Sequence, residues 1–115
     1  MPPFILDLVK LPSSDDSLSI YQAKGKLALE TVNEFIKTVR PDPAKYLVLD
    51  MSGITFLDSA GVGSLVSLFV NRRSQGKAFA LAALAPQASA VVTVAGLQNL
   101  LPVYNSVAEA AAKKV

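Results

Sequence analysis

The segment Tyr46–Met51, YLVLDM, constrains the fold more than any other part of this sequence. It is a nearly continuous apolar run, which is typical of a strand covered on both faces. After a short bend the spacing becomes helical, and this helix ends near RRSQGK, where Gly76 is a stop signal. The apolar stripe of the predicted helix, which we expect to face the core, consists of Val62, Leu65, Val66, Phe69 and Val70. A buried strand that leads directly into a helix predicts an α/β fold with a mostly parallel sheet and right-handed crossovers.

The same alternation continues on both sides of this unit. Strand-forming runs at 4–11 and 18–24 flank PSSDDS, which predicts an antiparallel hairpin. A helix follows from about residue 29 until RPDP stops it; its apolar stripe is Leu29, Val32, Phe35, Ile36 and Val39, with Thr31, Asn33, Glu34 and Lys37 on the opposite side. We expect a third buried strand at 78–84, a helix from Pro86 to about Ala95 that Gly96 closes, a short strand within 100–104, and a last helix behind the capping box of Ser106 and Glu109.

These elements predict one α/β domain over residues 1–115. An N-terminal β-hairpin is followed by β-α-β units, which form a mixed five-stranded sheet covered by helices, and the chain ends in a C-terminal helix.

Composition excludes several classes of function. The chain contains no Cys, His or Trp, so thiol nucleophiles, imidazole bases and the usual zinc ligands are missing. We therefore predict no catalytic residues, no metal and no cofactor. The net charge is +2 and the basic residues are spread along the chain, which argues against direct nucleic-acid binding. The start of the sequence has no basic segment typical of a signal peptide, so we expect a cytoplasmic protein.

An uncharged stretch lies between Lys77 and Glu109 and is 31 residues long. Pro86, Pro102 and several amides interrupt it too often for a membrane-spanning helix, so no membrane insertion is expected. The helix that begins at Pro86 then has an outer face without charge. This face predicts that the helix and the Gly96–Leu97 turn contribute to a homodimer or to a second protein interface. The alternative is that neighbouring elements, such as the C-terminal helix, cover it.

The candidate site is Asp58-Ser59, at the bend between the central strand and its helix, where α/β sheets present functional loops. The simplest interpretation is structural, because Ser is a favoured N-cap and Asp is favoured near a helix start. Gly61 and Gly63 are not part of a phosphate loop, because a third glycine and a Lys-Ser or Lys-Thr pair are missing. They are better explained by close approach to neighbouring backbone or to a docked partner. A Ser-Lys dyad of Ser59 and Lys26 lacks any visible oxyanion device.

The whole run 46–68, YLVLDMSGITFLDSAGVGSLVSL, resembles the central signature of the bacterial anti-sigma-factor antagonists, which are STAS domain proteins. The segment GKLAL at 25–29 is similar to the family's Gly-x-Leu segment, and 81–110 is similar to its second half, so the resemblance covers nearly the entire chain. There is one departure. Ala28, and also Lys26, stand where family members often carry acidic residues, which bears on how a kinase would recognise the site.

The resemblance implies that Ser59 is the phosphoacceptor. An anti-sigma factor with serine kinase activity would modify it, and a PP2C-type phosphatase would restore it. The unmodified protein would bind the anti-sigma factor and release the sigma factor. The expected partner-binding residues are Asp58, Ser59, Ala60, Gly61, Val62 and Gly63, together with Lys26. The alternative is an unswitched STAS adaptor in a transporter or signalling complex, which needs only the shape of this surface.

The physical chemistry of a phosphate at Ser59 agrees with a switch. A phosphate at a helix N-terminus meets free N–H groups, so the fold should survive. It adds about −1.5 to −2 charges beside Asp58, so partner binding should change. The β-α-β topology should also bring Lys26 to the same end of the sheet. There its ammonium group either stands beside the phosphate and stabilises the modified state or is a solvated surface lysine.

Overall fold

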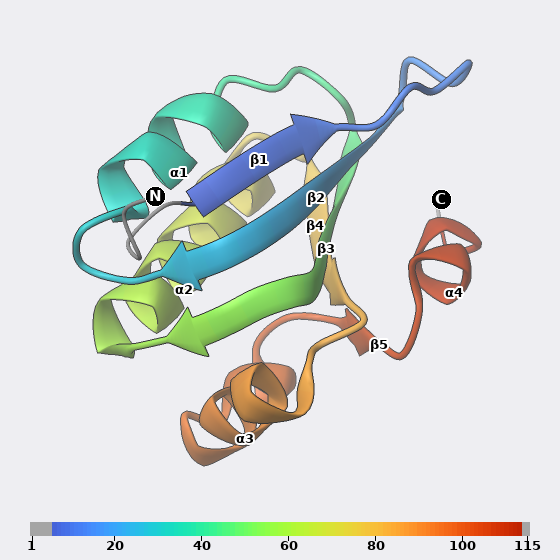
Figure 1. Cartoon of the computed structure of the whole chain (residues 1–115). Coiled ribbons are helices and arrows are strands. Elements are labelled where there is room, and N and C mark those ends of the chain that lie inside the picture. The colour runs from blue at the N-terminus through green and yellow to red at the C-terminus, as the bar shows by residue number, and fades with distance from the viewer. Residues whose placement is uncertain (1–5, 114–115) are drawn as a thin grey trace.

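The computed structural model describes residues 6–113, which form a five-stranded sheet in the order β1-β2-β3-β4-β5 (Figure 1). The strands are β1 (Leu6–Lys10), β2 (Leu18–Leu27), β3 (Tyr46–Leu57), β4 (Ala78–Ala82) and β5 (Val103–Tyr104). β1 and β2 are antiparallel, whereas every other neighbouring pair is parallel. The predicted hairpin and mixed sheet are therefore confirmed, although positions 4 and 5 of the first predicted strand lie outside the described residues.

The helices are α1 (Val32–Val39), α2 (Ser59–Ser74), α3 (Pro86–Val94) and α4 (Val107–Ala111), with a 3₁₀ turn at Leu97–Asn99. From β2 to β5 the strands are added in chain order and in one direction, so right-handed crossovers place α1, α2 and α3 on the same face of the sheet. α4 packs on the other face, against β3, β4 and β5 (Figure 1). Within residues 6–113 no helix combines the length and apolarity needed to cross a bilayer.

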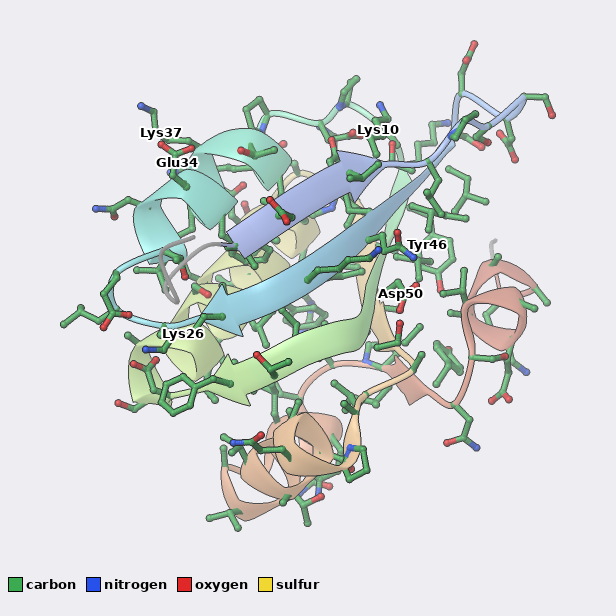
Figure 2. All side chains as sticks on the ribbon, in the orientation of Figure 1. Lys10, Lys26, Glu34, Lys37, Tyr46 and Asp50 are labelled. Carbon is green, nitrogen blue, oxygen red and sulfur yellow. The ribbon has the colours of Figure 1, made fainter. Side chains whose placement is uncertain are left out.

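β3 is buried on both faces, as its sequence predicts. Leu47 and Leu49 belong to the large core beneath α1, α2 and α3, whereas Tyr46 and Val48 belong to a small cluster with Ala110 of α4. The strand continues six residues beyond the predicted run, because its parallel pairing with β2 resumes after a bulge. Asp50, on the face of the sheet that α4 covers only in part (Figure 2), accepts a hydrogen bond of 2.9 Å from the N–H of Ser52 beside this bulge. The extension carries the end of β3 to Asp58.

The predicted helix faces are wrong at two apolar positions and one polar position. Leu29 is 72% exposed and precedes α1, and Val70 of α2 is 54% exposed. The buried residues of α2 are Gly61, Ser64, Leu65, Leu68 and Arg72. The small residues Gly61 and Ser64 thus let α2 lie close to the sheet, and Val70 lies on the solvent side of the helix. Thr31, expected on the solvent side, is buried and donates a hydrogen bond of 2.7 Å to the carbonyl oxygen of Lys26.

A buried polar network closes the end of the sheet where β3 and β4 begin. The carboxylate of Asp42 accepts hydrogen bonds from Ser19 (2.8 Å), Tyr21 (2.7 Å) and the Ala44 N–H (2.9 Å), and pairs with Lys10 at 3.1 Å. The guanidinium of Arg72 donates to the carbonyl oxygens of Asp42, Ala44 and Ala78. Burial by itself raises the pKa of Asp42, but the hydrogen bonds outweigh it and lower this pKa to about 2. Every polar group here has a structural partner, so the network joins β1, β2, α2 and β4 to the loop before β3.

Candidate interaction site at the start of α2

Asp58 connects two loops at the carboxyl end of β3. Its backbone is extended (φ −108°, ψ −175°), and its Oδ1 atom accepts the N–H of Gly61 at 2.8 Å. Its Oδ2 atom accepts the N–H of Leu29, in the loop after β2, at 3.2 Å. Asp58 is therefore the N-cap of α2, and the prediction that Ser59 has this role is wrong. An N-cap residue stands just outside the helix, whereas Ser59 is already the first helical residue.

Ser59 is consequently free of any structural task. Its side chain is exposed, and its hydroxyl makes no hydrogen bond to any residue within 6–113. The N–H groups of Ser59 and Ala60 belong to the first turn and have no carbonyl partner within the helix. A phosphate on this hydroxyl would meet two free donors and the positive end of the helix dipole. The carboxylate of Asp58 would oppose it from the neighbouring position.

Gly61 fixes the position of this helix start. A Cβ atom at Gly61 would lie 2.2 Å from the carbonyl oxygen of Leu27 and 2.7 Å from Cδ1 of Leu57. The first turn of α2 therefore touches the end of β2, as proposed for a glycine at this position. Gly63 differs, because a Cβ atom there would meet no atom within 4 Å. Close packing explains Gly61, while Gly63 only keeps the outer surface of the turn flat.

A groove of about 460 Å³ lies between α2 and α3, with Ser59 among its lining residues. It is lined by Leu57, Asp58, Ser59 and Val62 on the α2 side and by Ala90, Val91, Val94 and Ala95 on the α3 side. Only Asp58 and Ser59 bring polar side chains to it. Val94 is 90% exposed, and α4 does not cover it because that helix packs on the opposite face of the sheet. The uncharged face of α3 and the start of α2 thus form one continuous surface.

Two further exposed apolar side chains lie at this end of the sheet, outside the groove. Leu29 lies beside Asp58, and Phe56, near the end of β3, is 39% exposed. Lys26 pairs in register with Phe56, so it lies at the same end of the sheet as Ser59, as the topology predicts. Its Nζ atom lies 4.7 Å from the centre of the Phe56 ring, which is a cation–π contact.

A model of the STAS domain family matches residues 5–110, which is nearly the whole chain. This chain belongs to the STAS domain family. The STAS fold is also that of an anti-sigma factor antagonist from Mycobacterium paratuberculosis, at 21% identity and a TM-score of 0.83, covering 96% of this chain and 95% of that one. A putative anti-sigma factor antagonist from Thermotoga maritima gives 23% identity and a TM-score of 0.79, covering 96% and 92%. A sulfate transporter family protein from Wolinella succinogenes has 17% identity and a TM-score of 0.73, and the match covers 84% of this chain and 83% of that one.

These matches confirm the family and fold that the sequence resemblance implied. The structure gathers Asp58–Gly63 at the start of α2 and places Lys26 at the same end of the sheet. The sequence did not indicate that Leu29 and Phe56 are exposed at this end of the sheet, or that α3 forms one wall of the groove. The charge-free outer face of α3 was the available signal for this wall, but its position beside Ser59 depends on the packing of α2 against α3.

Proposed function

We propose that this STAS domain is an anti-sigma factor antagonist that is switched at Ser59. The unphosphorylated form binds an anti-sigma factor with serine kinase activity and thereby releases the sigma factor. Phosphorylation of Ser59 ends binding, and a PP2C-type phosphatase restores it. The observation that carries this proposal is the exposed hydroxyl of Ser59 beside an apolar groove. The domain acts as a cytoplasmic binding protein over residues 1–115, without catalytic activity of its own.

The chemistry of the groove supports a switch that acts on binding. Its uncharged walls favour a partner that buries apolar side chains there. A phosphate beside the groove would have to be desolvated when the partner docks, and its charge would add to that of Asp58. Lys26, Asp58 and residues 59–63 form the proposed contact surface together with the groove.

The test begins with purified protein, ATP and the anti-sigma kinase recovered from the host lysate. Mass spectrometry should find one phosphate, on Ser59, and none in Ser59→Ala. Ser59→Asp should weaken binding at least tenfold, or about 1.4 kcal/mol, with nearly unchanged thermal stability. Ser67→Asp is the matched control, because Ser67 is also exposed on α2 but does not line the groove.

A second pair of variants tests the groove itself. Val94→Glu places a charge among the lining residues, whereas Thr93→Glu places it on the exposed neighbouring position outside them. We expect only Val94→Glu to weaken partner binding. Sedimentation velocity of the same variants tests whether the face of α3 instead supports a homodimer. If neither variant changes binding or self-association, the groove is not an interface.

The second candidate is an unswitched STAS adaptor in a transporter-associated or signalling complex. Ala28 and Lys26 favour it, because a kinase would not find the acidic residues that are common at these positions. An adaptor needs the groove but no modification of Ser59. Equal binding by Ser59→Asp and the wild type, combined with weaker binding by Val94→Glu, would select this candidate.

A further inference from the structure

A second pocket lies at the end of the sheet opposite Ser59, where β3 and β4 begin. Its volume is about 390 Å³, and the residues that line it include Lys45, Tyr46, Pro102, Tyr104 and Lys113. Tyr46 donates a hydrogen bond of 2.7 Å from its hydroxyl to the carbonyl oxygen of Ala110, which holds α4 against the sheet. In Figure 2, Tyr46 lies between the sheet and α4, far from Lys26 at the other end. This pocket therefore does not belong to the proposed partner surface.

Among the described residues that line the pocket, the charged side chains are both lysines. Lys45 and Lys113 line it, and Lys77 stands between two further lining residues, Gly76 and Ala78. Among residues 6–113 none of these three lysines has a carboxylate partner within 4.0 Å. No Asp or Glu lines the pocket; the carboxylate that α4 carries belongs to Glu109. Several lysines around a concave surface concentrate positive potential there and attract anions.

The rest of the lining supplies an apolar wall. Pro102 contributes hydrocarbon surface, and the rings of Tyr46 and Tyr104 add flat faces. Small-molecule sites typically measure about 300–1,000 Å³ and combine mostly apolar walls with a few polar groups. Solvated surface lysines would carry positive charge without such a wall. The lining thus offers a cationic side and a ring-binding side within one pocket.

We propose that this pocket binds a small organic anion that carries a ring, either an aromatic carboxylate or an aromatic phosphate. The anionic group would lie between Lys45 and Lys113, and the ring would pack against Tyr104 and Pro102. The bound molecule would link the start of β3 to the end of α4. The site is independent of the proposed switch, because Ser59 follows the opposite end of β3.

Isothermal titration calorimetry provides a direct assay, since the phenol probe has the same chromophore as tyrosine and would obscure the fluorescence of the two pocket tyrosines. The probes are phenyl phosphate and benzoate, with phenol as the ring without charge and inorganic phosphate as the charge without a ring. We expect saturable binding of phenyl phosphate or benzoate, and the tighter of the two identifies the anionic group. Phenol and inorganic phosphate should bind at least tenfold more weakly. Backbone amide shifts should be confined to the segments around Lys45, Gly76 and Tyr104.

Variants decide whether the lysines hold the anion. The double variant Lys45→Gln with Lys113→Gln should weaken binding at least tenfold, whereas Lys37→Gln, an exposed lysine on α1 (Figure 2), should not. Ser59→Asp should bind the probe as the wild type does. The proposal is overturned if neither charged probe saturates, if inorganic phosphate binds equally well, or if Lys37→Gln weakens binding as much as the double variant. Amide shifts centred on the groove between α2 and α3 would overturn it as well.

Discussion

Replacing Gly61 by Ala tests whether the start of α2 rests on the end of β2. The added Cβ atom would lie 2.2 Å from the carbonyl oxygen of Leu27 and 2.7 Å from Cδ1 of Leu57. The Leu57 side chain can rotate away, but the Leu27 oxygen belongs to the backbone of a paired strand. The first turn of α2 must therefore move, and Ser59 must move with it. Gly63→Ala is the matched control, because its Cβ atom would meet nothing within 4 Å.

The magnitude follows from two opposing effects. Ala is favoured over Gly within a helix by about 1 kcal/mol, and Gly63→Ala should gain up to that amount. Gly61→Ala has the same gain, but overpacking typically costs about 1–3 kcal/mol, and a clash with backbone belongs at the upper end. We expect a net loss of about 1–2 kcal/mol in Gly61→Ala. The two variants should thus differ in the free energy of unfolding by about 2–3 kcal/mol.

Urea unfolding and thermal melting followed by circular dichroism measure this difference. In a domain of this size 1 kcal/mol corresponds to about 4 °C, so the two melting temperatures should be separated by roughly 8–12 °C. Amide shifts in Gly61→Ala should be concentrated in the first turn of α2. If Gly61→Ala were as stable as Gly63→Ala, α2 would not rest on Leu27, and the fixed position inferred for Ser59 would be incorrect.

Two further predictions concern Asp42 and Lys26. Because the folded pKa of Asp42 is lowered from 3.8 to about 2, its contribution of roughly 2.5 kcal/mol is present above pH 4 and is lost as the pH falls toward 2. Urea unfolding at several pH values should show this loss in the wild type but not in Asp42→Asn; an identical pH dependence would refute it. Lys26→Glu should slow phosphorylation of Ser59 and raise the phosphoserine pKa measured by ³¹P NMR, with Lys24→Glu as the control. An unchanged rate together with an unchanged pKa would show that Lys26 does not face the phosphate.

The order of strands and helices could be predicted from the sequence because each element carries its own local signal. The alternating hairpin strands, the apolar run of β3, Pro86 and the Ser106 cap act over short distances. The Ser106 Oγ atom does accept the N–H of Glu109, at 3.1 Å. The buried face of α2 could not be predicted in this way, because it includes Arg72. This side chain is buried only because the fold brings three backbone carbonyl groups to its guanidinium.

Only the part of the candidate site that depends on local sequence could be predicted. Asp58 and Ser59 are neighbours in sequence, so the junction itself was visible. Their roles were not, since either residue is an acceptable N-cap and the choice depends on where β3 ends. Leu29 showed helical spacing with Val32 and Ile36, but the loop that contains it turns toward Asp58 instead. The groove required α2 and α3 to be placed side by side, which no local pattern indicates.

The division of roles between Asp58 and Ser59 suits a switch that changes binding without changing the fold. Asp58 caps α2 and holds the loop after β2, so the structure of this corner does not depend on the neighbouring hydroxyl. If Ser59 were the cap, a phosphate would remove a structural hydrogen bond, and modification would alter stability together with binding. With the cap one residue earlier, Ser59 remains exposed beside an uncharged groove. Addition or removal of a phosphate can then act on the partner alone, which allows repeated switching of a folded domain.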